Sequence, residues 1–341
     1  MSRQETQVMK GIAILFMIFY HLFLHGADMD LCHSFIFING IPLAKILTRA
    51  MHPVAFYLIL GGYGLYKVWQ KGDKNRWKRI LKLYMHWWII MIIFVAIGHF
   101  IRPAKYPGSI SEFILNAIGY QYNYNGELWF LLPYVILSIF APVLFKLMSK
   151  FRALYVVIAT LFINLCTSFC ISRFGDLYFY KHLWAYQMLL PFHLLFNFSL
   201  GAMAARSNWF EKVAKKCGKS LKVNVLSWLA ILVLVTINCV FKYNFFYAFL
   251  FLTFFSLVRL TPTVSVILGK LGDNSMNMWM IHSWFCYHLF KSFTYSFTYP
   301  ILIFIVLTII SYVCSLLINR IADPIERLFM SRRQVEEKPI L

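Results

Sequence analysis

Charged residues are scarce in this chain of 341 residues, and acidic residues are the scarcest. Only 13% of the residues are charged and 13 residues are Asp or Glu, whereas 60% are hydrophobic. Soluble domains carry about a quarter charged residues, so this composition excludes an ordinary soluble domain. The net charge of +20 does not indicate a nucleic-acid partner, because the basic residues stand in short runs between apolar stretches.

Several motifs of soluble enzymes are also missing. The sequence has no HExxH pair and no Cys/His cluster, so we expect no metal site. Its seven cysteines show neither disulfide-framework spacing nor a CxxC pair. A glycine-rich phosphate loop and a GxSxG elbow are absent, which disfavours an ATPase or a soluble-type hydrolase. A signal-peptide cleavage site is absent too, so the apolar segment that begins near Val8 is expected to be retained.

Long apolar runs dominate what is present. A spanning helix needs about 20 mainly apolar residues, and these runs predict an all-α polytopic membrane protein with about ten transmembrane helices in one domain, residues 1–341. The predicted spans are 8–25, 51–68, 80–101, 127–145, 153–172, 183–205, 223–241, 245–260, 274–292 and 299–320. If the N-terminus is cytoplasmic, most Lys and Arg residues lie on the cytoplasmic side. The positive-inside rule therefore places both termini in the cytoplasm.

Aromatic residues crowd the segments that this topology places outside, as in 120–124 and 177–180. Aromatic side chains of this kind form belts at membrane interfaces. They also provide flat surfaces on which a sugar ring stacks. Both interpretations stay open from the sequence.

A lysine and two histidines mark the first apolar segment, which reads KGIAILFMIFYHLFLH from Lys10 to His25. Ionisable groups within a membrane are costly and point to function. Eleven helical residues return to within about 20° of the starting direction, so Lys10 and His21 share one face about 16 Å apart. This pair suits acyl-coenzyme A, with phosphate at Lys10 and the thioester near His21 as general base. The same spacing also fits a positive-inside lysine and a hydrogen-bonded packing histidine.

This segment resembles the first helix of the membrane-bound acyltransferase 3 family, in which a basic residue, usually arginine, is followed after ten residues by histidine. Further similar stretches follow in the family's order: PVAFYLILGGY from Pro53, RWKRILKLY from Arg76, NGELWFL from Asn125, FSLGAM from Phe198 and LGKLGDNSMNMWMIH from Leu268. Gly61 stands where serine is usual, and Lys10 and Lys82 stand where arginine is usual. The resemblance covers nearly the whole chain.

The resemblance implies transfer of an acyl group, most often acetyl from acetyl-CoA, to a hydroxyl of an extracytoplasmic glycan or lipid-linked sugar. It also implies a multi-pass protein of a bacterial inner or plasma membrane, with membrane lipids around it. The sequence carries no nucleic-acid-binding module, so we expect no nucleic-acid partner. Carried over residue by residue, His21 is the catalytic histidine, and Lys10, Arg79 and Lys82 bind the donor. A solvated positive-inside loop explains most of the other basic residues from Lys67 to Lys78.

Three further residues are secondary candidates. Glu127 is a second catalytic candidate that orients an acceptor hydroxyl or a histidine, or it caps a helix at its positive end. Trp129 and His282 are candidate substrate-binding residues, and Trp129 also fits an interface anchor. Six other histidines are expected to be interface or packing residues; they are His25, His52, His86, His99, His193 and His288.

Two other classes of protein fit parts of the sequence. A polytopic transporter or flippase for a glycan or lipid intermediate would also combine buried ionisable residues with aromatic outer loops. A membrane scaffold without activity is the third class, but it does not explain why Lys10 and His21 share one face. The absence of paired broken helices favours the acyltransferase over the transporter.

Overall fold

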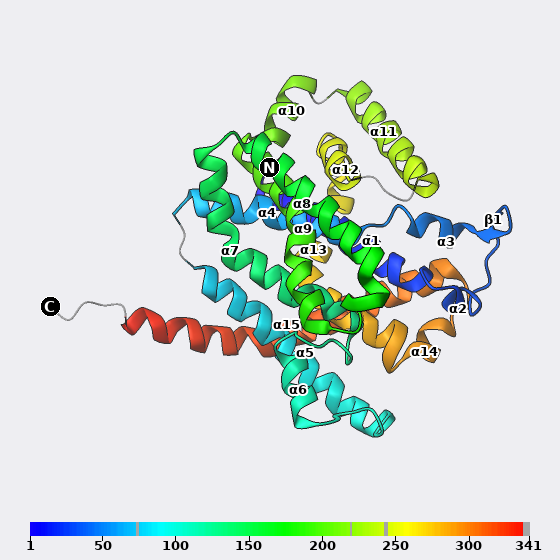
Figure 1. Ribbon diagram of the computed structural model, residues 1–341. Coiled ribbons are helices and arrows are strands. Elements are labelled where there is room, and N and C mark those ends of the chain that lie inside the picture. Colours follow the sequence, from blue (N-terminus) through cyan, green and yellow to red (C-terminus); the bar gives the residue numbers. More distant parts are fainter. Residues whose placement is uncertain (73–74, 219, 242–244, 337–341) are drawn as a thin grey trace. The chain divides into compact units, whose positions relative to one another are not determined.

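The computed structural model describes residues 1–72, 75–218, 220–241 and 245–336, apart from the side chains of residues 26, 27 and 329–336. This part of the chain is almost entirely helical, with one antiparallel hairpin formed by β1 (Phe37–Ile38) and β2 (Ile41–Pro42) (Figure 1). The chain divides into two compact units. The first comprises Met1–Asp73 and Leu132–Asp273, and the second comprises Lys74–Leu131 and Asn274–Leu341. Each unit is described by itself.

The first unit is a helical bundle with two short connecting helices near its start. Its helices are α1 (Arg3–Phe23), α2 (Gly26–Met29), α3 (Leu43–Thr48), α4 (Pro53–Gln70), α7 (Leu131–Lys150), α8 (Ala153–Phe174), α9 (Leu183–Arg206), α10 (Trp209–Cys217), α11 (Leu221–Val240) and α12 (Tyr247–Phe255), with the π-helical turn η2 (Gly175–Phe179) after α8. The first part of α13 (Pro262–Ser283) also belongs to it. Helices α8 and α9 pack side by side, and α4 packs along α9.

Glycines set the closest helix contacts of this unit. A Cβ atom on Gly62 of α4 would lie 2.9 Å from the carbonyl carbon of Phe198 and closer still to its oxygen. A Cβ atom on Gly201 of α9 would lie 2.7 Å from the carbonyl carbon of Ile59. Small residues let membrane helices approach until their backbones touch, and dispersion contacts then replace the hydrophobic driving force that lipid removes. The α4–α9 contact therefore depends on both glycines.

Helix α1 starts and packs for equally local reasons. Ser2 and Glu5 form a capping box at its first turn, in which each side chain accepts from the other residue's backbone N–H. Gly11 of α1 lies against the backbone of α13, because a Cβ atom there would lie 2.8 Å from the carbonyl carbon of Leu268. Gly272 does the same from the other side against Gln7. The part of α1 that carries Lys10 is thus held backbone to backbone.

The second unit consists of two long helices with shorter helices beside them. They are α5 (Arg76–Ile101), α6 (Ile110–Ala117), the 3-10 turn η1 (Gly126–Phe130), the remainder of α13, the π-helical turn η3 (Trp284–His288), α14 (Lys291–Tyr295) and α15 (Pro300–Glu336). Trp87 and Trp88 of α5 donate their indole N–H groups to the carbonyls of Asn116 (3.0 Å) and Ala117 (2.9 Å). The last carbonyls of a helix lack regular helical partners, and at the end of α6 the tryptophans add side-chain donors to the backbone bond that Gly119 N–H gives to Asn116.

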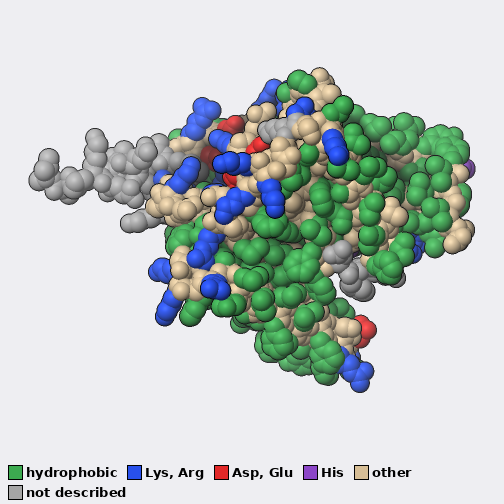
Figure 2. Space-filling view, turned by 90° about the horizontal axis from the view of Figure 1, so that it is seen from above, with side chains coloured by type: hydrophobic (Ala, Val, Ile, Leu, Met, Phe, Trp, Pro, Cys, Tyr) green, Lys and Arg blue, Asp and Glu red, His purple; other side chains and the backbone are tan. Residues whose placement is uncertain are grey.

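Length and composition identify membrane-spanning candidates in the described part of the chain. Eight helices there are long and apolar enough to cross a membrane. They are Arg3–Phe23, Leu43–Gln70, Arg76–Ile101, Gly126–Lys150, Ala153–Phe179, Leu183–Arg206, Leu221–Val240 and Pro300–Leu328. The expectation of an all-α polytopic membrane protein is confirmed. Large apolar side chains such as Phe162 and Phe169 of α8 point outward, as lipid contact requires, and hydrophobic side chains cover much of the face drawn in Figure 2.

Two of the ten predicted spans take a different form. The segment predicted as 245–260 forms α12, whose nine residues cover about 14 Å, roughly half of a hydrocarbon core. The segment predicted as 274–292 is helical through α13 and η3 but carries the polar residues Asn274, Ser275 and Asn277. The number of spans, the cytoplasmic termini and the single domain stay predictions.

Candidate active site

Lys10 and His21 lie on one uninterrupted helix. Because α1 runs from Arg3 to Phe23 without a break, their spacing corresponds to about 16 Å along one face. The side chain of His21 is buried, with 7% of its surface exposed, and its ring lies 5.3 Å from that of Tyr20. Lys10 is half-buried and interacts electrostatically with Asp273 of α13. The first unit thus presents a cation beside a carboxylate and an enclosed imidazole on the same helix.

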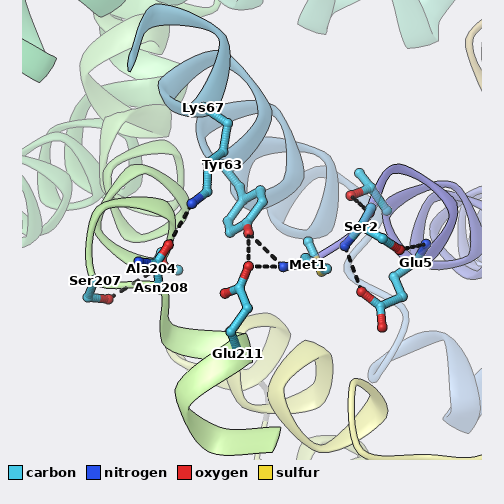
Figure 3. Close-up of polar contacts among 10 residues, drawn as sticks. Met1, Ser2, Glu5, Tyr63, Lys67, Ala204, Ser207, Asn208 and Glu211 are labelled. Atoms are coloured by element: carbon cyan, nitrogen blue, oxygen red, sulfur yellow. Dashed lines mark hydrogen bonds and ion pairs between the residues drawn. The ribbon is translucent and has the colours of Figure 1, made fainter. Parts of the chain in front are cut away.

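Polar contacts join α4 to α10 in the same unit (Figure 3). The hydroxyl of Tyr63 accepts from the amine of Met1 (3.0 Å) and donates to the carboxylate of Glu211 (3.2 Å), and the Met1 amine also pairs with Glu211. One turn along α4, Lys67 Nζ donates to Asn208 Oδ1 at 2.6 Å. Burial by itself would raise the pKa of Glu211, but the hydrogen bonds from the Met1 amine and Tyr63 outweigh it and lower that pKa.

The donor candidates Arg79 and Lys82 lie in the first half of α5, in the second unit. Both side chains are half-buried. Lys82 Nζ forms an ion pair with Glu326 Oε2 of α15 at 2.7 Å. The sequence interpretation did not name Glu326. An anion that binds Lys82 must therefore compete with the Glu326 carboxylate.

His86 was expected to be an interface or packing residue, and the structure shows it buried and hydrogen-bonded. Its side chain is 1% exposed, and both ring nitrogens have polar partners. Nε2 lies 2.7 Å from the other oxygen of Glu326, and Nδ1 lies 2.8 Å from Asn277 Oδ1. His86 and Lys82 are four residues apart and therefore meet Glu326 from the same face of α5.

A chain of amides continues from His86 between α13 and α15. Asn277 Nδ2 donates to Asn319 Oδ1 (2.8 Å) and lies 3.4 Å from the backbone carbonyl of Ser315. Asn274 Oδ1 in turn accepts from Asn319 Nδ2 and from Ser315 Oγ, both at 2.9 Å. Buried polar groups in a membrane must find partners within the protein, and this chain supplies them.

Glu127 and Trp129 lie on η1, which Asn125 caps and connects by hydrogen bonds to Met280 and Ser283. Asn125 is the N-cap of η1, because its Oδ1 accepts from the backbone N–H of Glu127 at 3.2 Å. The fully buried Asn125 also donates to the carbonyl of Met280 (2.8 Å) and accepts from Ser283 Oγ (2.6 Å). The side-chain cap is thus Asn125, and Glu127 lies in the first turn behind it. The sequence interpretation missed Asn125, although an Asn before a short helix is a common cap.

Trp279 links Glu127 to His282. The indole N–H of Trp279 donates to the backbone carbonyl of Glu127 at 3.2 Å, and the carbonyl of Trp279 lies 2.8 Å from Nδ1 of His282. His282 is fully buried. A ring that donates from Nδ1 to its own helix leaves Nε2 as the accepting nitrogen in its neutral form. The second unit therefore connects the backbone of Glu127 to the ring of His282 through Trp279, and Trp129 lies two residues after Glu127 on η1.

The aromatic segment 120–124 is partly internal. Tyr124 and Tyr106 are fully buried, their rings lie 5.5 Å apart, and Tyr106 lies 5.8 Å from the ring of Trp284. Burial raises the pKa of Tyr106 to about 12, so its hydroxyl stays neutral and acts as a donor. Tyr124 therefore offers no open face for stacking, while Tyr120 and Tyr122 are half-buried.

The seven candidate residues divide between the two units. Lys10 and His21 belong to the first unit. The other five belong to the second, where Arg79 and Lys82 lie in the first half of α5 and both Glu127 and His282 contact Trp279. Among the described residues, no group of three His, Cys, Asp or Glu side chains is arranged to hold a metal ion. The catalytic and binding roles of the seven stay predictions.

Comparison with protein families identifies the chain. A family model described as an acyltransferase domain matches residues 4–320, which covers all seven candidates and the glycine contacts of α1, α4 and α9. Comparisons with curated proteins and with solved structures gave no match. The resemblance noted from the sequence is confirmed. This multi-pass membrane protein therefore belongs to the acyltransferase 3 family and is an acyltransferase of the membrane type.

Proposed function

We propose that the protein transfers an acetyl group from acetyl-CoA to a hydroxyl of an extracytoplasmic glycan or lipid-linked sugar. The observation that carries this proposal is the single helix α1, which presents Lys10 and the enclosed His21 on one face. A donor with an anionic head and a long neutral arm fits a cation and an imidazole separated by about 16 Å. Bacterial inner or plasma membrane is the location that fits this acceptor class.

In the proposed reaction, His21 takes the proton from the acceptor hydroxyl as the oxygen attacks the thioester carbonyl. The acyl carbon–sulfur bond breaks, the new ester forms, and the proton passes from His21 to the leaving thiolate, so that atoms and charge balance. Histidine suits both steps because it accepts and donates protons near neutral pH. The burial of His21 supports this role, since exclusion of water protects the thioester from hydrolysis.

The basic residues of α5 support the donor end of the proposal. Lys10, Arg79 and Lys82 are the residues that we propose to bind the phosphates of acetyl-CoA, because phosphate pairs well with cationic donors. Glu127, Trp129 and His282 are the proposed acceptor-side residues. Both Glu127 and His282 contact Trp279: the Glu127 backbone carbonyl accepts from its indole N–H, and the His282 ring contacts its backbone carbonyl.

The decisive experiment measures release of coenzyme A thiol from acetyl-CoA by the purified protein in detergent, with extracted envelope glycans as acceptor. The native chain is compared with His21→Ala and with His25→Ala, a matched control whose histidine is exposed beyond the last turn of α1. Loss of a general base costs about 10²- to 10⁴-fold in rate, so His21→Ala should be nearly inactive and His25→Ala should not. Equal rates in both variants would remove His21 from the mechanism, and no release by the native chain would favour a transporter.

A further inference from the structure

Lys82, His86 and Glu326 form a charge cluster between α5 and α15 in the second unit. One carboxylate oxygen of Glu326 meets Lys82 Nζ and the other meets His86 Nε2, each at 2.7 Å. The two partners differ in their surroundings, because the side chain of Lys82 is 42% exposed and that of His86 is 1% exposed. The carboxylate thus has one partner at the protein surface and one in the interior.

The amide chain determines the role of Nδ1 of His86. Asn277 Nδ2 faces two acceptors, the side-chain oxygen of Asn319 and the backbone carbonyl of Ser315, and a backbone carbonyl cannot exchange roles. The oxygen of Asn277 must therefore face His86 Nδ1, so that nitrogen donates. The other ring nitrogen, Nε2, lies 2.7 Å from Glu326 Oε1, so Glu326 has a hydrogen-bond partner besides Lys82.

This arrangement leaves Lys82 as the partner that can be exchanged. A buried carboxylate without a partner is strongly unfavourable, which would normally prevent an ion pair from opening. Here Glu326 keeps its bond to the enclosed His86 when Lys82 leaves it. An ion pair with a partly exposed lysine contributes little to stability, so exchange of this partner costs little.

We infer that Glu326 is a positioning residue that acts through Lys82: it competes with a donor phosphate for the Lys82 ammonium and so sets how tightly the donor and the released coenzyme A bind. The inference rests on the proposed function, since it takes Lys82 as a donor-binding residue. In the donor-free protein Glu326 holds Lys82, and a phosphate group takes the ammonium while His86 retains the carboxylate. The competition makes binding weaker and product release easier.

If Glu326 competes for Lys82, removal of its charge should strengthen coenzyme A binding, whereas loss of a purely structural ion pair would weaken it. Removal of the competing charge in Glu326→Gln should tighten binding of coenzyme A about threefold, in line with the energy of a partly exposed ion pair. Lys82→Gln should weaken binding. If Glu326→Gln does not fold, Glu326→Asp is the second variant. It keeps the carboxylate for the enclosed His86, and the side chain shorter by one methylene should weaken the contact with the more exposed Lys82.

The test uses the full-length protein in detergent and two donors that share the reacting group. Acetyl-CoA carries the phosphates, and S-acetylpantetheine presents the same thioester arm without them. Glu326→Gln should lower KM for acetyl-CoA about threefold and leave KM for S-acetylpantetheine unchanged. Glu211→Gln, which removes a paired carboxylate from the first unit, is the matched control and should leave both KM values unchanged. Equilibrium dialysis with labelled coenzyme A gives the same comparison without catalysis.

The outcomes separate the two proposals. A higher KM for acetyl-CoA in Glu326→Gln, or an equal change for both donors, would show that the cluster only supports the fold and would overturn the inference. Unchanged coenzyme A binding in Lys82→Gln would overturn it too, while leaving a role for His21 intact. Failure of the native protein both to bind coenzyme A and to release it from acetyl-CoA would overturn the proposed function itself, and the inference with it.

Discussion

Replacement of Gly62 by alanine tests the backbone contact between α4 and α9 in the first unit. The new Cβ atom would lie 2.9 Å from the carbonyl carbon of Phe198 and 3.2 Å from the backbone nitrogen of Ala202. Both neighbours are backbone atoms of α9, so neither can turn away as a side chain would. The methyl group fits only if α4 and α9 move apart along a contact that also includes Gly201.

The expected cost follows from the geometry. Overpacking of a close contact destabilises a protein by about 1–3 kcal/mol. The same helix offers a matched control, because a Cβ atom on Gly64 meets nothing within 4 Å. Alanine is favoured over glycine within a helix, so Gly64→Ala should be neutral or stabilising by up to about 1 kcal/mol. The two variants make the same chemical change two residues apart, with opposite expected signs.

The assay is thermal unfolding of each purified variant in one detergent, followed by loss of monodisperse protein on size-exclusion chromatography. Gly62→Ala should unfold at a lower temperature than the native chain, and Gly64→Ala at the same or a higher temperature. If the two variants unfold at the same temperature, the backbone contact between α4 and α9 does not carry the stability that its geometry implies, and the reasoning fails.

Three further predictions concern other polar groups. Asn125→Ala should lower the free energy of unfolding by about 1–3 kcal/mol, because it removes the cap of η1 and leaves buried partners unpaired. It should also lower the rate of thiol release. The unfolding temperature reports the first effect and the thiol assay the second. Lys10→Gln should raise KM for acetyl-CoA about tenfold, the effect of losing one charge-assisted hydrogen bond, whereas Lys10→Arg should keep KM near the native value. The pKa of Glu211 is lowered in the folded state, so its stabilising contribution is complete above pH about 4.5 and is lost as pH falls below that value. The unfolding temperatures of the native chain and Glu211→Gln, measured between pH 7 and pH 3, should therefore converge at the acid end.

Local geometry made part of the candidate site predictable. The spacing of Lys10 and His21 follows from the helical repeat, and an apolar run of this length forms a helix whatever surrounds it. The capping box of Ser2 and Glu5 is equally local. Hence the sequence was sufficient to predict both the helix and the shared face on which the two candidates lie.

Glycine packing shows where such reasoning ends. The family resemblance singled out Gly61, where the nearest atoms to an added Cβ belong to the side chain of Tyr134. Its neighbour Gly62 is the residue that cannot accept a side chain, because it faces the backbone of α9. Adjacent residues on a helix point about 100° apart, and only the position of the second helix decides which of them is at the contact.

The cluster around His86 depended entirely on tertiary structure. Each helix shows its own polar spacing, with Lys82 and His86 four residues apart on α5 and Ser315 and Asn319 four residues apart on α15. The partner of His86, however, lies 240 residues away in the chain. The sequence by itself determined the helices, their apolar faces and the polar stripe on each one, because these depend on neighbours within a few turns. Only helix packing decided which stripes meet, since a buried charge is stable only where another helix supplies its partner.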